Sequence, residues 1–117
     1  MPNVRIIGVP PGEAPENVRQ AWVGLSLPLA KGQGIEPRSY RVGGALSGPK
    51  GLLPTLAVLV FKRYEAWEGY AVDTFLAVEI LSKAHPEAAN WWRSEAPHLT
   101  KPGKTLIFPA SICEIEP

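Results

Sequence analysis

Few residues in this chain of 117 have side chains that bind metals or act as nucleophiles. The chain holds two histidines, His85 and His98, and a single cysteine, Cys113. A structural zinc site takes its ligands from closely spaced pairs of cysteine or histidine, and the sequence contains no such pair. We therefore expect no metal site and no bound cofactor, and we interpret both histidines, each beside a proline, as polar loop residues. A metal site that they share with Asp73 or Glu114 is a weaker alternative.

Nucleophilic catalysis would need Cys113 or a serine beside a general base. Cys113 stands between Ile112 and Glu114 in a segment with strand character. On an inward strand face it would act as a small core hydrophobe, and the neighbouring carboxylate would raise its pKa rather than lower it. A small hydrolase or transferase that uses His98, Asp73 and Cys113 stays open as an alternative function.

Gly43 and Gly48 have the spacing of a phosphate-binding loop. Such a loop continues with a lysine that reaches the phosphates and a serine or threonine that binds Mg²⁺. Here Pro49, Lys50 and Gly51 follow, so the lysine is one position late and the hydroxyl is missing. This departure favours an ordinary glycine-rich loop over nucleotide binding.

Residues 31–51 carry the one local basic bias of the chain, with four basic residues and one acidic one. A tyrosine ring among cations is typical of surfaces that bind single strands, which makes single-stranded nucleic-acid binding a second alternative. The residues that would form that surface are Arg38, Tyr40, Arg41 and Lys50. The whole chain has a formal charge of only +1, so it lacks the strong field that gathers phosphates, and nucleic acid is not the favoured partner.

The four tryptophans are the most unusual feature of the composition. Each indole buries about 150–250 Å², so most of them are expected in the core. Trp91 and Trp92 lie about 100° apart on a helix and cannot both face inward. Trp67 lies on the strand face opposite Tyr64. At least one indole is therefore expected at a surface or interface, where tryptophan contributes strongly to protein binding.

The run 52–61 is the longest apolar stretch, interrupted by Pro54 and Thr55. We favour a helix over a buried strand here, because Pro54 and the pair Lys62-Arg63 match the polarity of helix ends. Apolar residues surround that helix, so it either lies in the core or pairs with another chain, while attachment to an anionic membrane surface is a weaker alternative. The run is too short for a membrane span, which needs about 20 residues. The residues predicted to bind a protein partner or a second copy are Leu56, Val60, Phe61, Tyr64, Trp67 and Trp91.

Short strands and helices are expected to position these residues. Thirteen prolines and eleven glycines favour many turns over an all-helical bundle. Pro15 favours one or two helical turns after it, and Pro86 interrupts a longer helical region and starts a second helix. The strands are expected near residues 4–8, 22–29, 39–43, 64–72, 105–108 and 112–116, and the helices near 54–63 and 73–95.

The first part of the region 73–95 has the clearest helical pattern. Asp73 or Thr74 can cap its start, and Glu79 can pair with Lys83 one turn later. The residues predicted to form its apolar stripe are Leu76, Ala77, Ile80, Leu81 and Ala84. In the second helix, the apolar side is expected to carry Ala88, Ala89, Trp92 and Ala96.

The segment 103–115 reads Gly-Lys-Thr-Leu-Ile-Phe-Pro-Ala-Ser-Ile-Cys-Glu-Ile, that is, a strand, a turn at proline and a final strand. It is similar to the closing segment of SH3-like small barrels. The resemblance implies architecture only, because fold does not imply function. For residues 1–117 we predict a single α+β domain, with a small, strongly bent antiparallel sheet or partly open barrel and two to three helices packed on one side.

A single cysteine suits a reducing compartment, and the first residues lack the pattern of a signal peptide, so a cytoplasmic location is expected. The sequence offers no catalytic or metal-binding set, is almost neutral and carries surplus aromatic residues. These features favour a non-enzymatic protein–protein interaction module that binds a partner or its own copy. The enzymatic and nucleic-acid alternatives stay open at this point.

Overall fold

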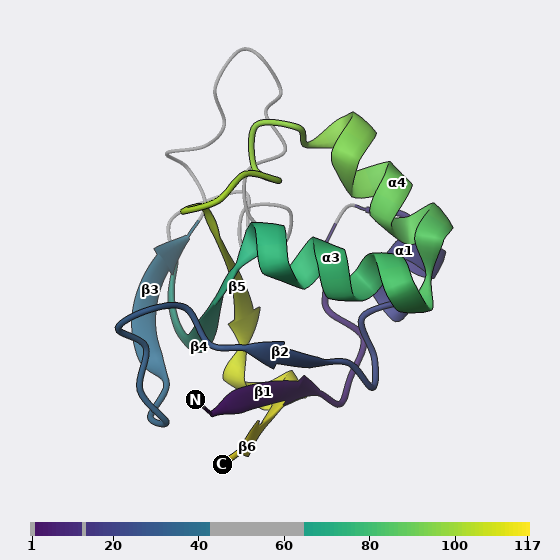
Figure 1. Ribbon diagram of the computed structural model, residues 1–117. Helices are drawn as coiled ribbons and strands as arrows, with labels where there is room; N and C mark the ends of the chain where they lie inside the picture. The colour runs from purple at the N-terminus through teal and green to yellow at the C-terminus, as the bar shows by residue number, and fades with distance from the viewer. Residues whose placement is uncertain (1, 13, 43–64) are drawn as a thin grey trace.

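The computed structural model describes residues 2–12, 14–42 and 65–117 (Figure 1). The predicted α+β class is confirmed: these residues form two three-stranded antiparallel sheets and three helices, and the sheets are not closed into a barrel. The helices α1 (Glu16–Gln20), α3 (Thr74–Ala84) and α4 (Pro86–Glu95) gather on one side of the sheets (Figure 1). None of the described helices has the length and apolar character needed to cross a bilayer.

The first sheet joins the two ends of the chain. Its strand order is β2 (Ser26–Pro28), β1 (Asn3–Ile6) and β6 (Cys113–Glu116), and both outer strands are antiparallel to β1. Val4 lies opposite Leu27 on β2 and opposite Ile115 on β6. One face of this sheet is therefore apolar and packs on the core, whereas the other face is polar.

The second sheet has the order β3 (Arg38–Val42), β4 (Glu65–Asp73) and β5 (Thr105–Pro109). Its strands lie close to the expected ranges 39–43, 64–72 and 105–108, and β5 is marked in the sequence by an unbroken apolar run rather than by alternation. A bridge between Leu29 and Val72 links the end of β2 to β4 and so connects the two sheets.

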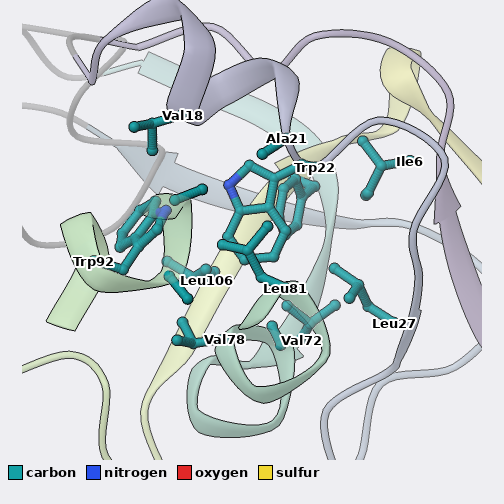
Figure 2. Packing of buried hydrophobic residues seen from close by; sticks show 14 of the residues in the cluster. Ile6, Val18, Ala21, Trp22, Leu27, Val72, Val78, Leu81, Trp92 and Leu106 are labelled. Atoms are coloured by element: carbon teal, nitrogen blue, oxygen red, sulfur yellow. The ribbon is translucent and has the colours of Figure 1, made fainter. Parts of the chain in front are cut away.

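Three aromatic side chains form the centre of the core between helices and sheets. Trp22 packs edge-on against Trp92, with ring centroids 5.9 Å apart, and against Phe108, at 5.4 Å. All three are almost completely buried. Figure 2 shows aliphatic side chains from both sheets and from α3 around Trp22 and Trp92, among them Val72 and Leu81. The core therefore depends on residues that are far apart in the sequence.

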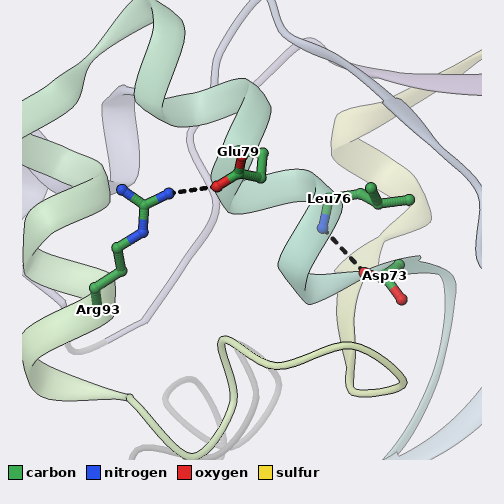
Figure 3. A network of polar contacts seen from close by, with 4 residues as sticks. All are labelled: Asp73, Leu76, Glu79 and Arg93. Atoms are coloured by element: carbon green, nitrogen blue, oxygen red, sulfur yellow. Dashed lines mark hydrogen bonds and ion pairs between the residues drawn. The ribbon is translucent and has the colours of Figure 1, made fainter.

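The two longer helices confirm the predicted break at Pro86, which is the first residue of α4. Asp73 caps α3, and its carboxylate accepts a hydrogen bond from the backbone N–H of Leu76 (3.0 Å; Figure 3). Glu79 pairs with Arg93 of α4 at 2.7 Å, not with Lys83 as the sequence suggested. The contact between the helices thus replaces the expected contact within one helix.

The apolar stripe of α3 is rotated from its predicted position. The buried residues of α3 are Thr74, Ala77, Val78 and Leu81. Leu76 is instead 47% exposed and Phe75 is 39% exposed. The predicted stripe was therefore wrong at Leu76 and at Ala84, which are both exposed, because the helix faces two sheets whose positions its own sequence does not specify. On α4 the prediction is confirmed: Ala88, Ala89, Trp92 and Ala96 are all buried.

The strand predicted over 22–29 is correct only at its end, since β2 covers Ser26–Pro28. Hydrogen bonds from the N–H of Trp22 to Arg19 and from the N–H of Val23 to Gln20 continue α1 as a turn. Gly24, with a positive φ of 89°, then reverses the chain. The alternation of apolar residues before Ser26 thus belongs to a turn that buries Trp22 and leaves Val23 exposed.

The C-terminal order of strand, proline turn and strand is confirmed: β5 ends at Pro109, a single 3₁₀ turn η2 (Ala110–Ile112) follows, and β6 closes the chain. However, β5 and β6 belong to different sheets. The resemblance to SH3-like barrels stays a prediction.

Candidate docking surface

Most of the predicted partner-binding residues lie outside the described residues: Leu56, Val60, Phe61 and Tyr64, together with the whole predicted helix 54–63. Trp67 lies in β4, opposite Tyr40 on β3. Trp91 is half-buried, and its ring meets that of Trp92 edge-on at 5.3 Å. Trp91 is thus a partly exposed indole of the kind the sequence predicts.

The predicted stacking residue Tyr40 is already engaged within the protein. Its hydroxyl donates a hydrogen bond to the side-chain oxygen of Gln33 (2.7 Å), and its ring packs on the buried pair Ala71 and Ile107. Burial raises the pKa of Tyr40 above its usual value. The neighbouring Arg38 donates to the carbonyl of Gly32. Both side chains therefore support the loop before β3.

The other two residues predicted to contact nucleic acid are Arg41 and Lys50. Arg41 lies in β3, opposite Ala66 of β4. Lys50 lies outside the described residues.

The three residues of the enzymatic alternative are not joined by a hydrogen bond in the part of the chain that the structure describes. Asp73 accepts backbone N–H groups on both carboxylate oxygens, from Leu76 and Gly103. His98 has a buried Nε2 atom with no hydrogen-bond partner among the described residues. Cys113 lies on β6, in the other sheet from Asp73. The described ranges also contain no group of three or more His, Cys, Asp or Glu residues that could hold a metal ion.

The thiol of Cys113 is expected to react slowly, because burial raises its pKa from 9.0 to about 12. Near pH 8, its thiolate fraction should be lower than that of a thiol of ordinary pKa by about three powers of ten. Alkylation by iodoacetamide should therefore be slow in the folded protein and fast in urea, with a cysteine-containing peptide as the control. A folded-state rate equal to that of the peptide would contradict the burial of this thiol.

A crevice of about 230 Å³ lies between α1 and the start of α4. Its lining residues are Asn17, Gln20, Ala21, His85, Glu87 and Ala88. The crevice brings together one imidazole and one carboxylate, yet every polar residue that lines it is exposed. It is also smaller than typical ligand pockets, which measure about 300–1,000 Å³. This site lacks the buried, oriented groups that catalysis requires.

The edge of the first sheet at β6 has no described strand beside it. The N–H of Ile7 donates to the carbonyl of Ile112 (2.8 Å). Ile7 and Ile112 are therefore a hydrogen-bonded pair, and this determines which residues of β6 direct their backbone groups toward β1. Because hydrogen-bonded pairs alternate in an antiparallel ladder, Glu114 and Glu116 direct their backbone groups toward β1. The N–H and C=O of Ile115 and the C=O of Cys113 point the other way, where none of the described strands lies, whereas the N–H of Cys113 donates to the carbonyl of Ala110 in η2.

The side chains of β6 alternate in the same way. Cys113 and Ile115 are partly buried and pack against the main core, opposite the fully buried Ile6 and Val4. Glu114 and its neighbour Glu116 lie on the polar face. The edge therefore combines free backbone groups with an incompletely covered apolar layer.

Apolar residues continue beyond one end of this sheet. Ile7, Val9 and Val23 are 51%, 38% and 40% exposed. Gly24 donates its N–H to the carbonyl of Ile6 (2.7 Å), so the turn that carries Val23 is held against the end of β1.

The alternating sequence of 112–116 was the signal for the β6 edge, but it did not show which strand β6 would join.

The chain matches no protein-family model, and no curated protein or solved structure is significantly similar to it.

Proposed function

We propose that the protein is a non-enzymatic interaction module that binds an extended segment of another protein as an added strand beside β6. The observation that supports this most directly is the outward direction of both backbone groups of Ile115 and of the carbonyl of Cys113, on the side of β6 where none of the described strands lies. Binding of an extended segment to a sheet edge is a common mode of peptide recognition.

Two contributions favour such binding. The N–H and C=O of Ile115 and the C=O of Cys113 offer up to three backbone hydrogen bonds, each with a net value of about 0.5–1.5 kcal/mol. An added strand would also cover the partly exposed side chains of Cys113 and Ile115, which already contact the core. Backbone pairing supplies affinity, and the side chains of alternate residues supply specificity.

Self-association through Leu56, Val60 and Phe61 stays a prediction, because these residues lie outside the described ranges. The proposal at β6 is independent of them.

A phage library of random heptapeptides tests the proposal. We expect selected peptides to bind the wild-type protein and to lose binding in Ile115→Pro, which removes an outward N–H that makes no bond to β1. Proline is tolerated at edge-strand positions of this kind. The control is Asn90→Ala, an exposed change on α4.

Hydrogen exchange on the wild type provides a readout that needs no variant. A bound peptide should slow exchange at the amide of Ile115, whereas the amide of Cys113 already donates to Ala110 in the free protein. Selected peptides that bind Ile115→Pro equally well and leave the Ile115 amide of the wild type unprotected would refute strand addition, as would a library that yields no binder.

A further inference from the structure

On the basis of the proposed function, we infer the chemistry of the partner: an extended segment in which apolar residues alternate with lysine or arginine. The inference follows from the two faces that β6 offers to a neighbouring strand. On the inward face, Cys113 and Ile115 favour apolar neighbours, since they border the buried core. On the polar face of the sheet, an added strand would place its side chains beside Glu114 and Glu116.

The carboxylates of Glu114 and Glu116 differ in the partners that they already have within the protein. Glu116 accepts a hydrogen bond from the hydroxyl of Ser26 and lies 4.0 Å from the guanidinium of Arg5. No described cation forms an ion pair with Glu114, which is exposed, although Arg5 lies opposite it in the register. Glu114 is therefore the carboxylate for which a basic residue on the added strand would be the natural cross-strand partner.

The same charges disfavour a second copy of β6 as the occupant. Two antiparallel copies that keep their buried faces on the same side pair residues of like orientation. Two such registers pair two or more residues of one β6 strand with residues of the other. In both registers a glutamate of one copy lies opposite a glutamate of the other. Like charges directly opposite each other are destabilising, so the acidic residues select against self-pairing and in favour of a basic segment.

Three capped hexapeptides provide the test, each alternating valine with lysine, serine or glutamate. They are titrated into ¹⁵N-labelled protein, and the amide signals of Cys113 and Ile115 are followed by NMR. We expect the lysine peptide to bind most tightly and the glutamate peptide most weakly. Because one cross-strand charge pair contributes modestly, Glu114→Gln should weaken binding of the lysine peptide about two- to fivefold and leave the serine peptide unchanged. Added salt should reduce the same preference.

The matched control is Glu87→Gln, which removes an exposed carboxylate on α4, away from β6, and should leave all three affinities unchanged. If the serine or glutamate peptide binds β6 as tightly as the lysine peptide, or Glu114→Gln has no effect, the inference is refuted while strand addition stands. If none of the peptides shifts the β6 amides, strand addition at β6 is refuted, and with it the partner chemistry.

Discussion

Trp22→Ala is expected to lower the free energy of unfolding by about 3–5 kcal/mol, the usual cost of removing a fully buried tryptophan. Trp22 has no exposed surface and meets Trp92 and Phe108 edge-on, and each such aromatic pair adds about 0.5–1.5 kcal/mol to the burial itself. A domain of ordinary stability has about 5–15 kcal/mol in total, so this variant should be close to the limit of folding.

Urea denaturation followed by circular dichroism measures the effect, and Trp91→Ala is the control. Trp91 contacts Trp92 but is only half-buried, so its loss should cost clearly less. Equal losses for the two variants would contradict the central position of Trp22. If Trp22→Ala does not fold at all, the smaller change Trp22→Phe gives a measurable intermediate loss.

Gly69→Ala is the second large change that we expect. A Cβ atom at Gly69 would lie 2.5 Å from the carbonyl oxygen of Phe108 and 3.1 Å from Cγ2 of Ile107. The oxygen belongs to the backbone of β5, which lies directly beside β4, so it cannot move without disturbing the β4–β5 ladder. Overpacking of this kind costs typically about 1–3 kcal/mol.

Gly34→Ala is the matched control for this substitution. A Cβ at Gly34 would have no heavy atom within 4 Å, so the added methyl should be neutral or slightly stabilising. Thermal unfolding of both variants gives the comparison. A melting temperature that is the same for Gly69→Ala and Gly34→Ala would show that the two strands do not approach as closely as the structure indicates.

The stability variants and the docking variants involve different parts of the molecule. Trp22 and Gly69 lie in the interior, whereas Glu114 is exposed on an outer strand. Glu114→Gln should therefore change peptide affinity with little change in unfolding, since substitutions at exposed positions usually alter stability by less than about 0.5 kcal/mol. Loss of binding through general unfolding can thus be separated from loss of a contact at β6.

Local signals in the sequence predicted the elements that have strong end markers. Asp73 and Pro86 define the starts of α3 and α4, because a capping carboxylate and a proline act through groups only a few residues away. The same local reasoning failed for residues 22–25, where alternating apolar residues form a turn. It also assigned Glu79 to Lys83, although the tertiary contact with Arg93 prevails.

The sequence by itself determined the α+β class, the break between the two long helices and the inward and outward alternation along 113–116, since these follow from backbone periodicity and from residues near one another in the chain. Only the tertiary structure decided that β6 pairs with β1, from the opposite end of the chain, and so leaves its other edge without a described strand. Strand pairing is non-local: alternation specifies which face of a strand is buried, but the neighbour is selected by how all the elements pack around Trp22, Trp92 and Phe108. The candidate docking edge follows from that packing.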